Sequence, residues 1–213
     1  MKVKATTTRR ARAAPVPEPE RRAAILSAAQ TCFWRSGIRR TAIEDVAVEA
    51  GLAKGTIYLY FASKEELFAG LAAELCRESL EAVEAALAGE GGITRRLAAA
   101  LDAKIGHFHR LLAGSPHAAE LLDGSATIAA EPLAKLDRAF RAALERALAA
   151  AKLGLDSQAR AELVELVLAA GYGTARAGEL AGRLGSAGQR TKLERHIELL
   201  LEGAGARTSG RSK

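Results

Sequence analysis

Aromatic residues are scarce in this sequence of 213 residues, although apolar residues are not. Phe, Trp and Tyr make up only 4% of the chain, whereas 49% of it is hydrophobic, chiefly Ala and Leu. Alanine and leucine are strong helix formers, and the chain lacks the long alternating runs of β-branched residues that are typical of strands. We therefore expect an all-α protein with about nine helices.

Long apolar runs and cysteine motifs are missing as well. No stretch approaches the ~18 apolar residues that a membrane-spanning helix needs, and the basic N-terminus has no apolar segment of the secretory type. The two cysteines, Cys32 and Cys76, form neither a CxxC pair nor a disulfide framework. They are expected to be small buried residues, and these features together favour a cytoplasmic protein without a membrane partner.

Motifs of enzyme active sites are also lacking. The sequence has no GxSxG, Walker A, HExxH or GxGxxG motif in a suitable context. We expect no catalytic residues, no bound metal and no resident cofactor.

Positive charge is concentrated in the first third of the chain. Residues 1–64 carry 12 Lys and Arg against 5 Asp and Glu, a net charge of +7. Residues 65–213 carry 19 against 20, a net charge of −1. Such an asymmetry is typical of an N-terminal part that binds a polyanion, although a basic tail that only aids solubility would give the same count.

Glycines and capping residues divide the chain into four parts. Thr41 and Glu44 form a predicted capping box, and so do Ser63 and Glu66. Gly37 is expected to end the first helix. The predicted parts are a disordered basic arm (1–18), a DNA-binding domain (19–64), a ligand-binding and dimerisation domain (65–203) and a disordered tail (204–213). The expected helices span about 19–36, 41–50, 53–60, 63–88, 93–113, 115–124, 131–153, 156–177 and 186–203.

The segment Thr41–Phe61 has the pattern of a helix-turn-helix. Its sequence is TAIEDVAVEAGLAKGTIYLYF, in which two short helices would meet at Gly51, a residue that tolerates positive φ. Apolar side chains fill one face of the first helix, and the second helix keeps an unusually polar and aromatic face, which suits the major groove of DNA. That face comprises Lys54, Thr56, Tyr58 and Tyr60.

The longer stretch GIRRTAIEDVAVEAGLAKGTIYLYFASKEELF, Gly37–Phe68, closely resembles the N-terminal domain of TetR-type (tetracycline repressor-like) regulators. The resemblance implies that Thr41 caps its helix and contacts phosphate, and that Tyr60 and Lys64 clamp the DNA backbone. Packing for the tyrosines and simple exposure for Lys64 remain the alternatives. Arg39 and Arg40 are further phosphate candidates, or part of a solvated face. Contacts within the major groove are implied for Lys54, Gly55, Thr56 and Tyr58. The arm, with Arg9, Arg10 and Arg12, is an additional candidate for contact with the minor groove or neighbouring phosphates, and a disordered tail without such a contact is the alternative.

Two C-terminal segments are candidates for a dimer interface. Leu163–Tyr172 is apolar nearly all round, and the last helix has an apolar stripe. The resemblance implies that these helices pair with those of a second copy in a four-helix bundle, and burial inside the chain is the alternative. The candidate interface residues are Leu163, Val167, Leu193, Ile197, Leu200 and Leu201.

The resemblance also implies a pocket for a small-molecule effector between about residues 93 and 177. His107 and His109 lie about 200° apart on a helix, so they cannot hold one metal ion between them. An apolar pocket with one or two polar anchors is the preferred interpretation. Candidate lining residues are His107, Phe108, His117, Phe140 and Tyr172.

The sequence thus predicts a dimeric repressor that binds a pseudo-palindromic double-stranded DNA operator and is released by an unidentified effector. Two alternatives remain: an architectural DNA-binding protein that needs no effector, and an α-helical enzyme in which the helix-turn-helix is incidental.

Overall fold

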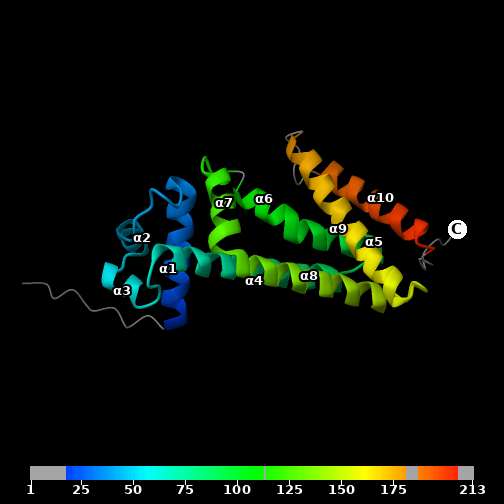
Figure 1. Cartoon of the computed structure of the whole chain (residues 1–213), viewed down its shortest axis with the longest axis horizontal. Coiled ribbons are helices and arrows are strands. Elements are labelled where there is room, and N and C mark those ends of the chain that lie inside the picture. Colours follow the sequence, from blue (N-terminus) through cyan, green and yellow to red (C-terminus); the bar gives the residue numbers. More distant parts are fainter. Residues whose placement is uncertain (1–17, 113, 181–186, 206–213) are drawn as a thin grey trace, which may run out of the picture.

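The computed structural model describes residues 18–112, 114–180 and 187–205, and within these ranges every regular element is a helix (Figure 1). Most of the predicted arm and tail lies outside the described residues. The elements are α1 (Glu18–Ser36), α2 (Ile43–Ala50), α3 (Lys54–Tyr58), α4 (Lys64–Ala88), α5 (Ile93–Leu101), the π-helical turn η1 (Asp102–Gly106), α6 (His107–Leu112), α7 (Ala118–Ile128), α8 (Ala130–Ala150), α9 (Ser157–Leu180) and α10 (Ala187–Gly203).

The helix count agrees with the sequence prediction, because α5, η1 and α6 form one continuous run. Counted this way, the described residues contain nine helices. The predicted end of a helix near Gly124 is wrong, since α7 continues to Ile128. Gly124 serves packing instead: a Cβ atom there would lie 2.3 Å from Cδ1 of Ile38. No described helix has the length and apolarity to span a membrane.

The two predicted capping boxes differ in outcome. Before α4, the Ser63 hydroxyl accepts the Glu66 backbone N–H at 3.0 Å, and the Glu66 carboxylate accepts that of Ala62 at 2.6 Å. Before α2, the N-cap is Ala42, whose backbone N–H is bound by the Asp45 carboxylate at 2.8 Å. The box predicted at Thr41 is therefore shifted by one residue, because the Thr41 side chain turns inward.

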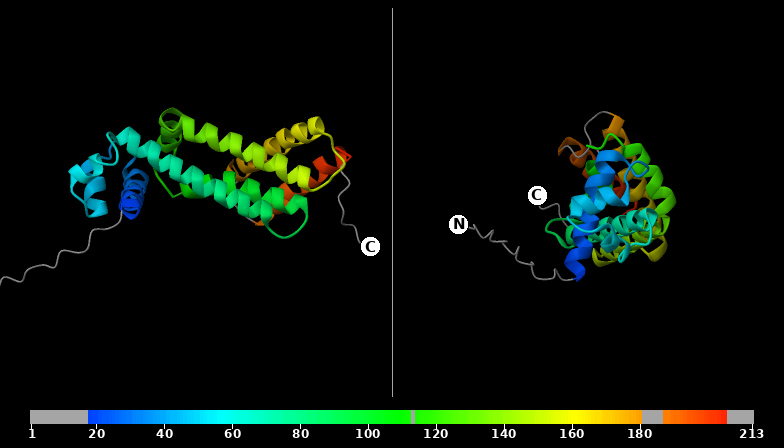
Figure 2. Two further views of the ribbon diagram at one scale, coloured as in Figure 1. Left: turned by 90° about the horizontal axis from the view of Figure 1, so that it is seen from below. Right: turned by 90° about the vertical axis from the view of Figure 1, so that its left-hand side faces the viewer.

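Helix α4 belongs to both hydrophobic cores of the molecule. Its first half contributes to a core that includes residues of α1, α2, α3 and α7, and its second half to a core that includes residues of α5, α8, α9 and α10. Phe68 of α4 meets Phe33 of α1 edge to face, with ring centroids 5.5 Å apart. The N-terminal core ends at Leu75 along α4 and the second begins at Val83, so packing changes within α4 rather than at the predicted boundary of residue 64. Figure 2 shows α4 and α8 running side by side along the long axis.

Both cysteines are buried and free, as the sequence predicted. Burial raises the pKa of the Cys32 thiol, and it raises the pKa of Cys76 to about 11. Because the thiolate is the reactive form, both residues act as apolar packing groups near neutral pH.

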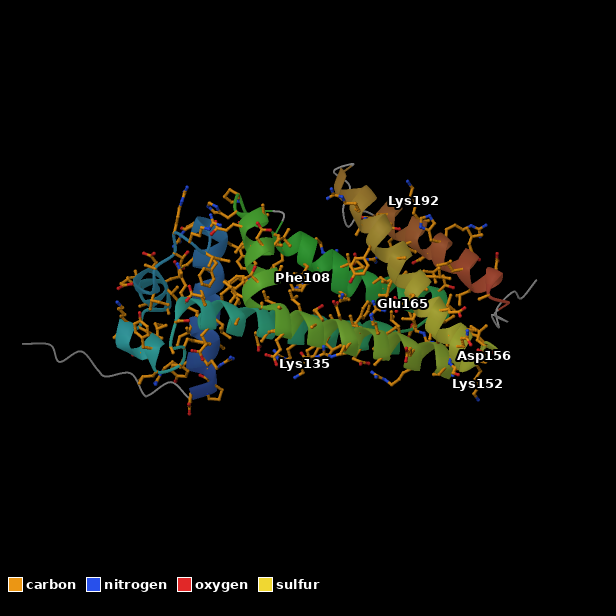
Figure 3. The ribbon with its side chains drawn as sticks, viewed as in Figure 1. Phe108, Lys135, Lys152, Asp156, Glu165 and Lys192 are labelled. Carbon is orange, nitrogen blue, oxygen red and sulfur yellow. The ribbon has the colours of Figure 1, made fainter. Side chains whose placement is uncertain are left out.

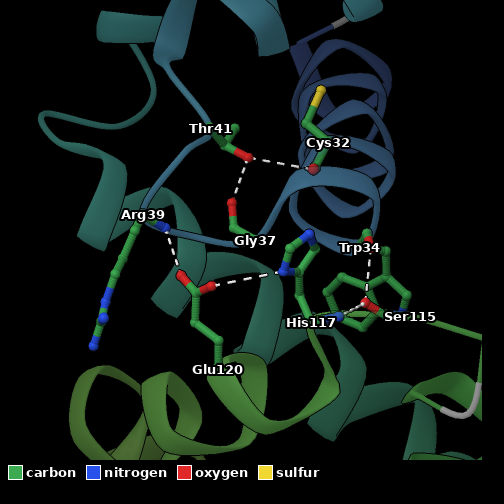
Figure 4. A network of polar contacts seen from close by, with 8 residues as sticks. All are labelled: Cys32, Trp34, Gly37, Arg39, Thr41, Ser115, His117 and Glu120. Atoms are coloured by element: carbon green, nitrogen blue, oxygen red, sulfur yellow. Dashed lines mark hydrogen bonds and ion pairs between the residues drawn. The ribbon is translucent and has the colours of Figure 1, made fainter.

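A polar joint connects α1 with the segment around the start of α7 (Figure 4). The Trp34 indole N–H donates to the carbonyl oxygen of Leu111 at 2.7 Å, and the Ser115 hydroxyl donates to that of Trp34 at 2.7 Å. The Glu120 carboxylate accepts the backbone N–H of Arg39 at 2.7 Å. Three hydrogen bonds thus fix α6 and the region around the start of α7 to α1 and to the connection that follows it.

Gly37 allows this joint to close. Its φ is +80°, a conformation that L side chains resist, and a Cβ atom there would lie 2.5 Å from Oε2 of Glu120. No other residue type combines this backbone conformation with so close an approach.

We predict that Gly37→Ala lowers the free energy of unfolding by about 2–3 kcal/mol in urea denaturation, through backbone strain and displacement of the Glu120 carboxylate. Gly154→Ala is the matched control, because Gly154 has φ +77° and a Cβ atom placed there would have no neighbour within 4 Å. It should cost only about 1 kcal/mol. Equal costs for the two variants would contradict the role given to the Glu120 contact.

Candidate nucleic-acid interface and effector region

Helices α2 and α3 form the predicted helix-turn-helix. Gly51 ends α2 with φ +65°, and the Leu52 backbone N–H returns to the carbonyl oxygen of Ala47 at 2.9 Å. Helix α2 buries Ile43, Val46 and Ala47, and α3 buries only Ile57, which is fully covered. One side of α3 therefore packs on the core, and the rest of this short helix is open to solvent.

The open side of α3 carries most of the predicted contact residues. Lys54, Gly55 and Tyr58 are exposed, and Thr56 is half-buried. Nothing lies within 4 Å of a Cβ atom placed on Gly55, so the fold itself does not require glycine there. A glycine on an open helical face lets another molecule approach the backbone closely. Tyr60 differs from the exposed residues, since it is half-buried against the N-terminal core.

Lys54 forms an ion pair with Glu44, a residue that the sequence predicted only as part of a capping box. The ammonium group also lies 5.6 Å from the centre of the Tyr58 ring. The hydrogen bond from Lys54 lowers the pKa of Glu44, and the same bond raises the pKa of Lys54. Both groups are fully charged near neutral pH, so a phosphate that binds Lys54 competes with a carboxylate that is already in place.

The predicted phosphate contacts before α2 and at the start of α4 have internal partners. Thr41 is 2% exposed, and its hydroxyl lies 2.7 Å from the carbonyl oxygen of Gly37, to which it donates. Lys64 donates to the carbonyl oxygens of Arg39 and Thr41 at 3.2 and 3.1 Å. In this conformation Thr41 and Lys64 hold the α1–α2 connection together. Arg39 and Arg40 are exposed, and the Arg39 side chain extends away from Glu120 (Figure 4).

In the C-terminal domain, the structure gathers a cluster around Lys104, which the sequence analysis missed. This residue lies in η1 and is 7% exposed. Its ammonium group donates to the Asp137 carboxylate at 2.5 Å and to the Tyr172 hydroxyl at 2.7 Å. It also lies 5.1 Å from the ring centre of Phe140 and 5.3 Å from that of Tyr172. Two predicted pocket residues, Phe140 and Tyr172, are thus brought together by a buried cation.

The other predicted pocket residues lie elsewhere. Phe108 packs against the N-terminal core, on the inner side of α6 (Figure 3). His117 lies at the joint, with Nδ1 3.9 Å from Oε2 of Glu120. His107 has a buried Nε2 atom without a hydrogen-bond partner. The five residues therefore do not line one pocket. Among the described residues, no three His, Cys, Asp or Glu side chains are grouped as a metal site would require.

Two sizeable cavities open on the described surface. The larger, about 480 Å³, lies between α4 and α8, with Cys76, Leu80 and Leu136 among its apolar walls and Lys135 also lining it. The second, about 400 Å³, lies at the joint between the α1–α2 connection and α7, where Glu120 and Asp123 line it. Both fall within the size range of small-molecule sites.

The structure corrects the expected dimer interface. Five of the six candidate residues are buried within the chain, and Leu200 packs against the same core. An apolar stripe shows that one face of a helix is covered, but it does not show which surface covers it. Here α9 and α10 pack against each other and against α5. Among the side chains that the structure describes on these two helices, the large apolar residues left exposed are Leu166 (51%), Tyr172 (47%) and Leu199 (49%). The buried candidates are Leu163, Val167, Leu193, Ile197 and Leu201.

Comparison with known proteins agrees with this geometry. Residues 25–71 match the family model of bacterial regulatory proteins, tetR family. The chain is similar to the uncharacterised HTH-type transcriptional regulator YfiR of Bacillus subtilis, with 49% identity over 49 residues, which cover 23% of this chain and 24% of that protein. The first curated relatives are matched over only about a quarter to a third of their length.

Solved structures extend the likeness in fold to nearly the whole chain. A transcriptional regulator of Pseudomonas aeruginosa PAO1 superposes with a TM-score of 0.69 at 18% identity, covering 89% of this chain and 92% of that one. FadR of Bacillus subtilis, in complex with stearoyl-CoA, superposes with a TM-score of 0.58 at 21% identity, covering 85% and 98%.

We predict that Asp137→Ala lowers the free energy of unfolding by about 1–2 kcal/mol, because the buried Lys104 ammonium loses its counter-ion. Lys104→Met should cost less than about 1 kcal/mol, since methionine fills the space without a charge to compensate. In the double variant the cost of Asp137→Ala should largely vanish. Urea denaturation measures all three, and exposed Glu145 on the same helix supplies the control Glu145→Ala. Additive costs in the double variant would contradict the coupling.

Proposed function

We propose that this chain, which carries the DNA-binding domain of the TetR-type regulators, is a transcriptional repressor that binds operator DNA as a homodimer and responds to a small molecule. The observation that carries the proposal is the single-sided packing of α3. Its core-facing residue Ile57 is fully buried, while Lys54, Gly55 and Tyr58 are offered to solvent next to an N-terminal domain of net positive charge. A short helix presented in this way suits the major groove.

A homodimer supplies what one recognition helix lacks. A single helix of five residues buries too little surface for tight and selective binding, and a twofold dimer presents two of them about one DNA turn apart. Figure 1 shows α9 and α10 at the end of the molecule away from α1–α3. We place the interface on the exposed side of these two helices, around Leu166 and Leu199, rather than on the buried stripe.

The proposed effector region is the C-terminal domain, in the space that α4 and α8 border and around Lys104. The cavity between α4 and α8 supplies apolar walls, and Lys104 is a buried cation whose counter-ion Asp137 has a side chain that is 55% exposed. A ligand with an anionic or strongly accepting group can replace this carboxylate. Phe140 and Tyr172 would then flank the ligand group with aromatic surface.

The joint offers a route from the effector region to DNA. Helix α7 holds the Arg39 backbone through Glu120 and touches Ile38 at Gly124, so a shift of α7 displaces the connection that leads into α2. Helix α4 is shared by both cores and would move with it. Coupling of this kind between two sites is typically worth about 1–3 kcal/mol and acts in both directions.

The decisive experiment is selection of bound DNA from a random pool with the full chain, followed by titration at rising salt. We expect a pseudo-palindromic site bound with a Kd of about 10⁻⁸ M or tighter, and an affinity that falls steeply with salt. Lys54→Ala should weaken binding at least ~10-fold, because it also leaves Glu44 unpaired. Arg138→Ala, which removes an exposed cation on α8 that lines neither described cavity, should leave binding unchanged.

The proposal would be refuted if the protein formed no specific complex with DNA at micromolar concentration. Equal affinity for all sequences would instead support the architectural alternative.

For the dimer, we predict that Leu166→Asp raises the dissociation constant by on the order of 100-fold, since each copy would bury a carboxylate without a partner. Sedimentation velocity measures the shift to monomer. Leu122→Asp is the matched control, because Leu122 has the same exposed fraction of 51% but lies on α7. A dimer that survives Leu166→Asp would move the interface elsewhere.

A further inference from the structure

Leu59 is the most exposed large apolar residue among the described residues of the chain. Its exposed fraction is 83%, although it directly follows α3 and stands between two tyrosines. Its backbone continues the helical conformation, with φ −70° and ψ −22°, and its N–H donates to the carbonyl oxygen of Thr56 at 3.2 Å. The position of its side chain is therefore set by the helix.

Helical geometry places the Leu59 side chain at the end of α3, on the same side as its open face. At about 100° per residue, both Gly55 and Leu59 lie about 200° from the buried Ile57, and thus point away from the core. They are four residues apart, so they lie one above the other on the same face. The outward face thus carries Gly55, with open space around it, and one turn later the exposed side chain of Leu59.

We propose that Leu59 contacts the 5-methyl group of a thymine in each operator half-site. The inference rests on the proposed function, because it assumes that α3 enters the major groove. The thymine methyl is the one apolar group that a base pair presents there, and an aliphatic side chain has no hydrogen bond to offer to other base edges. Gly55 permits the close approach that brings the leucine to the base, while Lys54 and Tyr58 beside it supply polar contacts.

The proposal makes the operator itself testable. The full chain is first used to select DNA from a random pool, and each thymine recurring in both half-sites is then replaced by deoxyuridine, which lacks only the methyl group. For one such thymine, the wild type should lose about 4-fold in affinity per half-site, and about 15-fold when both are replaced. Leu59→Ala should bind both DNAs with equal affinity, and Leu59→Met should retain the preference for thymine.

Val48→Ala is the matched control, because Val48 is an apolar residue of nearly equal exposure, 82%, on α2. It should keep the full wild-type response to deoxyuridine. Leu59 contributes little to the core, so circular dichroism and thermal unfolding should show Leu59→Ala to be folded like the wild type.

The outcomes separate this inference from the proposed function. A selected site at which wild type and Leu59→Ala respond equally to deoxyuridine, or at which no thymine matters, overturns the role of Leu59 and leaves the regulator intact. Failure to select any site overturns the proposed function, and the role of Leu59 with it.

Discussion

Helix α4 must satisfy two hydrophobic cores at once, and the rest of the structure depends on this constraint. Its 25 residues span about 37 Å. Leu67, Phe68 and Leu71 are buried in the N-terminal core, and Val83 and Leu87 in the other. A continuous ladder of backbone hydrogen bonds makes the helix a stiff rod, so neither core can rotate about α4 without disturbing packing in the other.

The joint between α1 and α7 adds a second connection to the one that α4 provides. Two attachments between the same two parts restrict their relative motion far more than a single hinge would. At this joint Leu112 and Leu121 are buried in the N-terminal core, and polar contacts to backbone atoms are added by Trp34, Ser115 and Glu120. Such contacts have defined directions, and they exchange with water more readily than a packed apolar surface does.

Local features were predictable from the sequence, and distant ones were not. Gly51, the capping of α4 by Ser63 and the open face of α3 follow from residue types a few positions apart. The bond between Glu120 and the Arg39 backbone joins residues 81 positions apart, and no local pattern signals it. The cluster of Lys104 with Asp137 and Tyr172 escaped for the same reason, since Lys104 and Asp137 alone are typical of an exposed helical surface, and the Tyr172 position gave no sign of either partner.

The prediction of the dimer interface from the apolar stripe was wrong for another reason. Periodicity reports that one face of a helix is apolar, and the same pattern results whether the covering surface belongs to the same chain or to a second copy. Leu163 and Ile197 are covered by their own chain, whereas Leu166, about 60° from Leu163 around the same helix, is 51% exposed. Thr41 shows a similar ambiguity at short range, because its hydroxyl can cap α2 or turn inward toward Gly37, and only tertiary packing decides between the two.

The ion pair between Glu44 and Lys54 has a consequence for how the protein discriminates among anions. The Glu44 carboxylate acts as a tethered ligand of fixed local concentration for Lys54, the lysine of α3. A loosely placed phosphate, such as one on a non-cognate duplex or a free polyanion, must first displace it and gains little in the exchange. A phosphate or base edge held in register by the rest of the interface gains from all its contacts together. The ion pair therefore makes the unbound surface bind such anions more weakly than its net charge suggests.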